Sequence, residues 1–449
     1  MASAVQELNL QRQTGAAHAD LGLRRLMANI LRKGTLAVTD QALFSGANFM
    51  VNVLLARWLA PAEYGAYSVA FAVFLLFASL HMAIVIEPMM VFGAGKYSSR
   101  FPRYLRAVFA GHLAVMAPAS ALLFATTLLL RKLYSPAVEQ ALRGLVFAAA
   151  AILLFWLVRR VFYVLLQPGW GAISGALYSV LLLGTVGLLK YTSNLSTQTA
   201  FLAMGVAGLV ASVIVMIRFV PAWSSRTARP IFKEVCTDHW RYGRWALATA
   251  LVGWFPGNVY YALLPMYLGL EGSGGLRALM NFVLPVLQAI SALTMLLLPM
   301  LVRDRAQGGP KKMNRTMLMF LALFCGGAVV YLTGLWFFRD SVFQIFYGGK
   351  YSQFAGWPLF LTGLLPLATC ASAVLGHALR ALERPDAIFW CTAGSTLGAV
   401  LAGIPLSATL GVSGALLGLL ASSVITVAMM GWFYWRALQE GSRESGAAL

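Results

Sequence analysis

The chain is short of charge, and especially short of acidic residues. Only 15 of its 449 residues are Asp or Glu, and charged residues of both signs make up 11%. Soluble domains carry about 25% charged residues, so this composition excludes the soluble globular class. With 60% hydrophobic residues and a mean hydropathy of +0.75, the chain is typical of a protein that lies in a lipid bilayer.

Several functional signatures are missing as well. The four cysteines are scattered, and neither a metal-binding spacing nor a disulfide framework emerges from them. There is no nucleotide-binding loop, metal cluster or nucleophile–base arrangement of a standard kind. We therefore expect a transporter rather than an enzyme, with no cofactor. Residues 1–35 are polar and basic and lack the hydrophobic core and cleavage site of a secretory signal.

What the chain does contain is a series of apolar stretches of about 20 residues, the length that a helix needs to cross the hydrocarbon core. A helix pairs its own backbone groups, which cannot be left unpaired in lipid, so each stretch predicts a transmembrane helix. The twelve predicted spans are 36–56, 66–90, 107–130, 144–166, 170–189, 199–219, 243–264, 274–301, 316–338, 354–376, 387–408 and 412–435.

Cationic residues gather in every second gap between these spans. With the amino-terminal tail in the cytoplasm, 24 of the 34 Lys and Arg fall on the cytoplasmic side. This is a positive-inside bias, so both termini are predicted to be cytoplasmic. The net charge of +19 suits anionic lipid of the inner leaflet as a partner. Nucleic acid is not expected as a partner, because no recognition motif accompanies the charge.

The two halves of the chain repeat short motifs. Asn48 in the first span corresponds to Asn258 in the seventh, Glu63 to Glu271, and the Gly at 205 to the Gly at 411, at offsets between 206 and 210 residues. Six spans, an even number, separate the copies, so the halves are predicted to be parallel repeats related by an axis along the membrane normal.

The predicted fold is therefore an all-α integral membrane protein with twelve transmembrane helices in two parallel six-helix repeats. Its predicted parts are a cytoplasmic basic tail (1–35), a first six-helix lobe (36–220), a cytoplasmic linker (221–242), a second six-helix lobe (243–435) and a cytoplasmic carboxyl-terminal tail (436–449).

Three segments of the sequence resemble a known family. Leu55–Gly65 (LARWLAPAEYG), followed by an apolar span, resembles the first hairpin of the Wzx-type polysaccharide-unit flippases. These are members of the multidrug/oligosaccharidyl-lipid/polysaccharide (MOP) exporter superfamily. Phe346–Tyr351 (FYGGKY) before the tenth span and Ala378–Pro385 (ALRALERP) after it are similar to stretches found there in that family. The resemblance covers about residues 25–437.

This resemblance implies a V-shaped, two-lobed bundle with a central cavity. It also implies that the protein moves a polyprenyl-diphosphate-linked saccharide from the inner to the outer leaflet of a bacterial inner membrane. The pathway would be exopolysaccharide or O-antigen synthesis, with the polymerase and other export proteins as partners. The lipid II flippases of the superfamily usually carry two further carboxyl-terminal spans, which this chain lacks.

Two other interpretations remain open. A drug or cation antiporter of the same superfamily also has twelve spans, although it would favour a carboxylate-dominated cavity. A membrane-bound polysaccharide polymerase or ligase characteristically needs a large periplasmic loop, whereas the longest one predicted here is 339–352.

A few ionisable residues lie inside the spans, where a charge costs at least ~2.5–3.5 kcal/mol at the bilayer centre, so each is a candidate site. Asp40 in the first span and Glu87 in the second are expected at similar depth near the cytoplasmic face, as a site for a coupling cation or proton. His81, deeper in the second span, is a candidate proton relay. The alternatives are a helix cap or a pair with Lys33 for Asp40, a loop arginine for Glu87 and an ordinary interior hydrogen bond for His81.

Arginines in or at the ends of spans suit a diphosphate cargo, because guanidinium binds phosphate oxygens bidentately. Neighbours on a helix point about 100° apart, so at most one of an adjacent pair is expected to face a cavity squarely. Those at the span ends could equally extend to lipid headgroups. The candidates are Arg159 and Arg160 in the fourth span, Arg277 in the eighth, and Arg57, Arg241 and Arg244 at span ends.

Asn48 and Asn258 hold matched positions in the two halves, so both are candidates for the cavity lining. Hydrogen bonding between helices explains them nearly as well.

Overall fold

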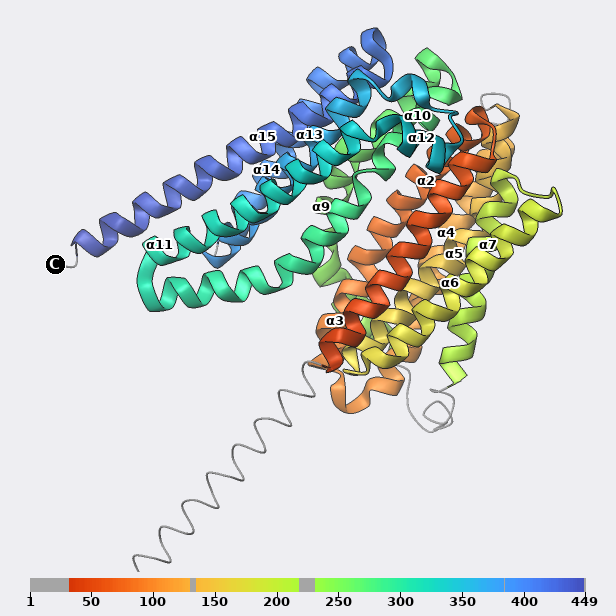
Figure 1. The fold of residues 1–449 in the computed structure, drawn as a ribbon. Coiled ribbons are helices and arrows are strands. Elements are labelled where there is room, and N and C mark those ends of the chain that lie inside the picture. The colour runs from red at the N-terminus through yellow and green to blue at the C-terminus, as the bar shows by residue number, and fades with distance from the viewer. Residues whose placement is uncertain (1–31, 130–134, 218–230, 383, 448–449) are drawn as a thin grey trace, which may run out of the picture.

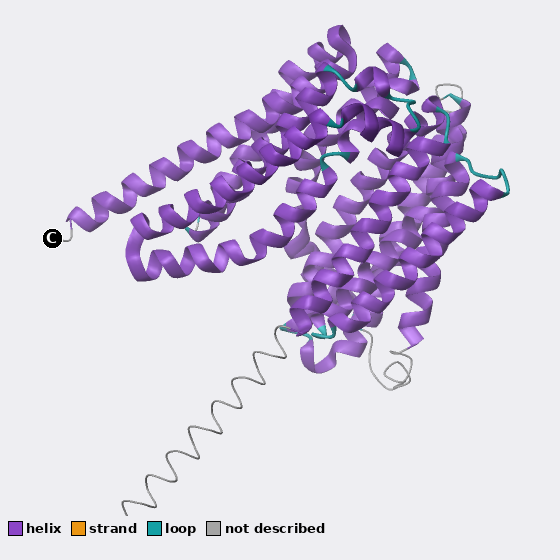
Figure 2. Cartoon of the chain, viewed as in Figure 1, coloured by secondary structure: helices purple, strands orange, loops and turns teal. Residues whose placement is uncertain are grey.

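The computed structural model describes residues 32–129, 135–217, 231–382 and 384–447. Within these ranges nearly every residue is helical, and there is no strand (Figure 2). Nine helices of the described chain are long and apolar enough to cross a membrane, or ten if the bent pair Leu270–Asn281 and Leu284–Ile290 forms one span. The all-helical membrane fold is confirmed, whereas the count of twelve spans stays a prediction. Most of the predicted tail 1–35 lies outside the described residues.

The first lobe consists of a helix at 32–58 and the helices α2 to α7 (Figure 1). Proline occupies the first helical position of α2, α5 and α6, where no backbone N–H is needed. Helix α5 packs against α2, α4, α6 and α7 and so forms the centre of the lobe. The bounds are α2 Pro61–His81, η1 Met82–Ile86, α3 Glu87–Ala94, η2 Ser98–Arg100, α4 Phe101–Leu129, α5 Pro136–Val164, α6 Pro168–Tyr191 and α7 Thr197–Met216.

A π-helical turn, η1, interrupts the second predicted span between α2 and α3. Such a turn widens the helix and frees backbone groups for other partners. The carbonyl of Ile84 in η1 lies 3.0 Å from Nδ1 of His239, which comes from α9. The π turn is therefore a point at which a distant helix docks on the first lobe.

The second lobe contains two helices that fold back on themselves. The backbone is non-helical at Gly308 and Gly309 within α11 and at Gly411 within α15. Gly309 and Gly411 have φ of 66° and 58°, a left-handed conformation that favours glycine. The bounds are α9 Phe232–Leu268, α10 Leu270–Asn281, α11 Leu284–Phe337, α12 Arg339–Tyr347, η4 Ser352–Phe354, α13 Trp357–Ala381, α14 Pro385–Gly398, η5 Ala399–Gly403 and α15 Ile404–Ala447.

Helix α9 joins the two lobes. The described part of the predicted linker is mainly helical, because α9 begins at Phe232 and continues into the predicted seventh span. Its first turns are held on the first lobe by ion pairs. Nζ of Lys96 lies 2.6 Å from the Asp238 carboxylate, and Nη2 of Arg100 lies 2.9 Å from that of Glu234.

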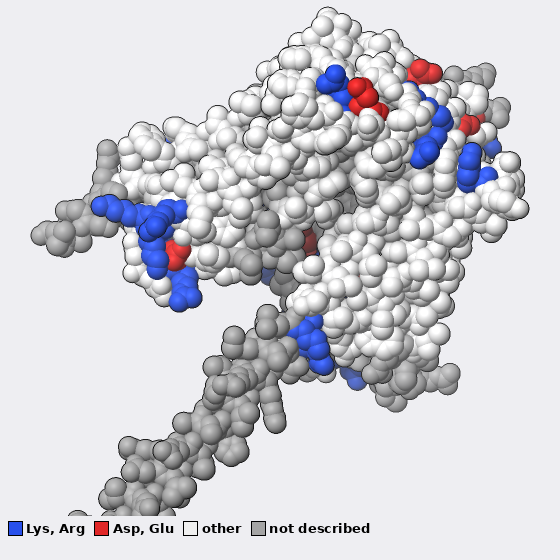
Figure 3. Space-filling model, viewed as in Figure 1, with Lys and Arg blue, Asp and Glu red and all other residues white. Residues whose placement is uncertain are grey.

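The lobes meet at one end and separate at the other (Figure 1), and the space-filling view is hollowed between them (Figure 3). We call the end where α2 begins and where α10 and α12 lie the closed end. The end with α3, the bend of α11 and the carboxyl end of α15 is the open end. Two cross-lobe hydrogen bonds lie at the closed end: Arg57 donates to the Ile345 carbonyl (2.6 Å) and Lys350 to the Leu59 carbonyl (2.7 Å).

Candidate transport cavity

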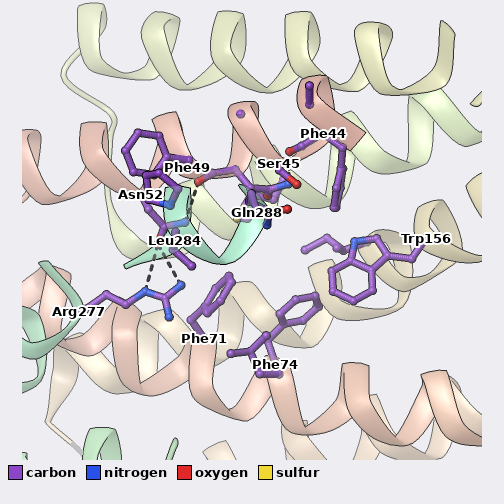
Figure 4. A pocket seen from close by; sticks show the side chains of 17 residues that line it. Phe44, Ser45, Phe49, Asn52, Phe71, Phe74, Trp156, Arg277, Leu284 and Gln288 are labelled. Carbon is purple, nitrogen blue, oxygen red and sulfur yellow. Dashed lines mark hydrogen bonds between the residues drawn. The ribbon is translucent and has the colours of Figure 1, made fainter. Parts of the chain in front are cut away.

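A cavity of about 520 Å³ lies between the lobes. The first helix, α2, α5 and α7 contribute to it from one side, and α10 and α11 from the other (Figure 4). One part of the lining is aromatic, and another part is made of uncharged polar side chains. No described lining residue is acidic, and Arg277 is the one charged residue among them. The aromatic residues are Phe44, Phe49, Phe71, Phe74 and Trp156, and the uncharged polar ones are Ser45, Asn48, Asn52 and Gln288.

Arg277 on α10 is 8% exposed and is held by uncharged groups. Its Nε and Nη2 donate to Oδ1 of Asn52 at 3.2 and 3.1 Å (Figure 4). The guanidinium carbon lies 4.2 Å from the centre of the Phe71 ring, within the range of a cation–π contact. No carboxylate of the described residues pairs with it. Since a buried charge is costly unless it is compensated, this site favours an anionic ligand.

Arg159 and Asp40 neutralise each other inside the first lobe. Nε and Nη2 of Arg159 donate to the two carboxylate oxygens of Asp40 at 3.1 and 2.8 Å, and the Tyr163 hydroxyl donates to the same group at 2.5 Å. Asp40 is fully buried and Arg159 is 6% exposed. Neither is among the residues that line the cavity. Phe44 lies between this ion pair and the cavity, because it lines the cavity and its ring centre is 4.1 Å from the Arg159 guanidinium.

The remaining arginines lie elsewhere. Arg160 is half-buried, with its guanidinium 5.7 Å from the centre of the Tyr163 ring, and it makes no ion pair within the described residues. Arg57 is exposed and bonds across the closed end. Arg241 and Arg244 are exposed near the start of α9. None of the four is among the residues that line the central cavity, so the structure does not bring the six arginines together.

The matched asparagines line two different cavities. Asn48 lines the central one, where its Nδ2 donates to the Phe44 carbonyl (2.8 Å). Asn258 lines a second cavity of about 550 Å³ between α2–α3 and α9. Leu75 lines both, so the two cavities adjoin. We call them the arginine chamber and the glutamate chamber, because the second contains Glu87.

The three candidates for ion coupling are separate from one another. Asp40 packs against α6, where both Gly171 and Gly175 approach its carboxylate, whereas Glu87 is exposed toward α9 in the glutamate chamber. His81 is buried within the first lobe, with its Nε2 2.9 Å from Nδ1 of His112 on α4. Nδ1 of His81 has no hydrogen-bond partner in the described chain.

The sequence contains a local signal for some partners at these sites and none for others. Asn52 lies one turn after Asn48, so a helical face shared by two asparagines was a usable signal. Tyr163 likewise follows Arg159 by one turn. His112 is 31 residues from His81, and no local pattern connects them. No three His, Cys, Asp or Glu side chains of the described residues are grouped so that they could hold a metal ion.

The architecture is that of the transporters of the MOP superfamily. An inward-facing multidrug resistance MATE family transporter of that superfamily matches with a TM-score of 0.72 and 14% identity over 89% of this chain and 95% of its own. The lipid II flippase MurJ in an inward closed conformation matches with a TM-score of 0.66 and 14% identity over 90% of this chain and 86% of its own. An outward-facing MATE transporter matches with a TM-score of 0.62 and 15% identity over 92% of this chain and 96% of its own.

Identities this low establish the fold alone. No protein-family model matches the sequence, and no curated protein matches it either. The superfamily fold expected from the sequence is thus confirmed, and the Wzx-type assignment within it stays a prediction. The TM-score is higher for the inward-facing MATE structure than for the outward-facing one, so the lobes are arranged more like the former.

Proposed function

We propose that this chain is a flippase of the bacterial inner membrane for a polyprenyl-diphosphate-linked oligosaccharide repeat unit, used in exopolysaccharide or O-antigen synthesis. The observation that carries the proposal is Arg277, a buried cation without a carboxylate partner in the described residues, at the wall of a cavity between two lobes.

The charge of the cargo follows from this residue. A diphosphate has several oxygens that can replace Asn52 as the acceptor for the guanidinium, and charge-assisted hydrogen bonds of this kind are strong. A cationic drug in the same cavity would meet a positive charge of its own sign. The aromatic side chains of the lining supply apolar surface for the less polar parts of the cargo.

The orientation follows from the cationic loops. Lys96, Arg100 and the cations near the bend of α11 lie at the open end, which the positive-inside rule assigns to the cytoplasm. The arrangement then corresponds to a state that faces the inner leaflet, with anionic lipid around the basic loops and both termini in the cytoplasm. Alternating access would expose the arginine chamber to the other side.

The His81–His112 pair is the candidate for ion coupling in this flippase cycle. Asp40 is the weaker of the candidates, because Arg159 already compensates its charge. The second candidate function is a drug or cation antiporter. The likeness to MATE transporters and the carboxylate of Glu87 at the wall of the glutamate chamber favour it.

The proposal is tested in a deletion strain by measuring lipid-linked repeat units in each leaflet. We expect them to accumulate in the inner leaflet and wild-type protein to reverse this. Arg277→Gln should bind the cargo about 10- to 150-fold more weakly, since a hydrogen bond to a charged group contributes about 1.5–3 kcal/mol, and it should therefore leave repeat units accumulated in the inner leaflet. Arg143→Gln, which removes an exposed ion pair with Glu139, is the matched control and should complement fully.

Normal distribution of the repeat units in the deletion strain would refute the flippase function. Export of a cationic dye that depends on the protein would favour the antiporter instead. Full complementation by Arg277→Gln would refute the role of Arg277 in binding the cargo.

A further inference from the structure

The glutamate chamber has a different chemistry from the arginine chamber that it adjoins. Its walls come from α2, η1 and α3 on one side and α9 on the other, and its volume of about 550 Å³ is within the size range of small-molecule sites. Glu87 is the one charged residue among the described lining residues. The two chambers thus place a cation and an anion on either side of Leu75.

Glu87 has unused binding capacity. It is the first residue of α3, directly after the π turn, and its side chain is exposed to the chamber. No cation of the described chain pairs with it, unlike Asp40, Glu234 and Asp238, each of which lies in an ion pair. An ionised carboxylate accepts hydrogen bonds and donates none, so the ligand it suits carries hydroxyl or amine donors.

The opposite wall supplies an aromatic face and a second acceptor. The indole N–H of Trp254 donates to the Ala72 carbonyl of α2 (3.0 Å), which fixes the ring where the chambers meet. Nδ2 of Asn258 donates to the Trp254 carbonyl (2.9 Å), and its Oδ1 accepts no hydrogen bond within the described residues. A rigid aromatic ring with an amide acceptor one turn away suits a polyhydroxylated ring, which has an apolar face and a rim of donors. Glu87 lies about four turns further along α2–α3, where a later sugar of the chain would lie.

We infer that the glutamate chamber holds the saccharide of the cargo while the arginine chamber holds its diphosphate, and that Glu87 selects sugars without acidic groups. This inference rests on the proposed function. A uronic acid at the sugar that reaches Glu87 would place its carboxylate beside that of Glu87, and like charges at close range repel. Glu87 is then a specificity-determining residue for the sugar.

The test measures binding to the full-length protein in nanodiscs with three probes: polyprenyl diphosphate, its derivative with a chain of four glucose residues (the glucosyl probe), and the same chain ending in glucuronic acid (the glucuronosyl probe). A chain is needed because Glu87 lies 16 residues after Phe71 along α2–α3, about 20 Å from the level of Arg277. The two sugars are nearly the same size and differ in the carboxylate. We expect wild-type protein to bind the glucosyl probe about tenfold more tightly than the glucuronosyl probe. Glu87→Gln should bring that ratio close to one and leave the affinity for polyprenyl diphosphate unchanged.

Two further variants separate selectivity from folding. Glu87→Asp keeps the charge and should keep most of the preference for the neutral sugar. Glu271→Gln removes an exposed carboxylate at the closed end and should leave all three affinities as in wild type.

The outcomes distinguish this inference from the proposed function. Failure of the wild-type protein to bind polyprenyl diphosphate overturns the proposed function and, with it, the inference. Binding of that probe with a sugar preference that Glu87→Gln does not alter overturns the inference alone. Loss of the sugar-free probe in Glu87→Gln would assign Glu87 to the diphosphate site or to folding, and would also overturn it.

Discussion

Arg159 and Arg277, the two buried arginines among the described residues, are compensated in different ways. Arg159 has a carboxylate partner, Asp40, and a hydroxyl completes the network. Arg277 has an amide oxygen and the faces of aromatic rings, which offset only part of the cost of burying a charge. The first arrangement is closed and stabilises the lobe, whereas the second leaves a charge that a ligand can complete.

At the residue scale, Asp40→Ala should destabilise the protein by about 3–5 kcal/mol, because it leaves Arg159 buried without a partner. The measurement is the free energy of unfolding in mixed detergent micelles. Glu139→Ala breaks an exposed pair with Arg143 and should cost less than about 1 kcal/mol. Replacing Asp40 and Arg159 together by leucine should recover most of the loss. Equal effects of Asp40→Ala and Glu139→Ala would contradict the role assigned to the buried pair.

At the scale of elements, the junction of α9 with the π turn is a polar helix contact on the first lobe. His239, on the part of α9 before the span Ala246–Leu268, donates through Nδ1 to the Ile84 carbonyl, and its Nε2 lies 2.7 Å from the Tyr104 hydroxyl. Burial lowers the pKa of His239 below its ordinary value, although the bond to Ile84 and the charge of Asp238 act in the other direction. The neutral imidazole is therefore the form that the junction accommodates.

This predicts a stability that depends on pH. The pKa of His239 is lower in the folded than in the unfolded protein, where it is about 6.5, so protonation favours unfolding. The stabilisation that neutral His239 provides is complete above about pH 6.5 and is lost as the pH falls toward and through the pKa of His239 in the folded protein. The free energy of unfolding changes by at most about 1.4 kcal/mol per pH unit in this range. His239→Gln cannot titrate, so its unfolding free energy between pH 7 and 5 should fall less steeply. An unchanged slope in that variant would show that other groups cause the dependence.

At the scale of the whole molecule, the closed end depends on close contact between the lobes. Gly65 on α2 packs so tightly against α10 that a Cβ there would overlap the Leu270 carbonyl. Gly274 on α10 faces Pro61 in the same way, at 2.8 Å from its carbonyl to a Cβ. A transport cycle must separate these surfaces, so small residues at this point hold the balance between the two states.

Gly65→Leu should therefore shift the protein toward the form that is open at this end. Overpacking costs about 1–3 kcal/mol, which enlarges the fraction of open molecules roughly 5- to 150-fold. The measurement is the rate at which an impermeant thiol reagent, added on the outer side, modifies Asn48→Cys after the four native cysteines are replaced. Gly184→Leu, where nothing lies within 4 Å of an added Cβ, is the control. A labelling rate equal in both variants would exclude this contact as the gate.

The sequence by itself determined the membrane class, the approximate spans and the unusual charges within them. Apolar length and cationic loops report directly on a bilayer, because lipid acts on each segment separately. Asp40, Glu87 and Arg277 could be singled out for the same reason, since a charge in a span is costly wherever its helix packs.

Only the tertiary structure decided which of these charges remains available to a ligand. Asp40 meets Arg159 across 119 residues of chain, and Arg277 meets Asn52 across 225. These pairings depend on the rotation of each helix about its axis, which is set by packing between helices and is not encoded locally in a single sequence. The orientation of α5 directs Arg159 into the lobe and that of α10 directs Arg277 to the cavity wall, although both are residues of apolar spans.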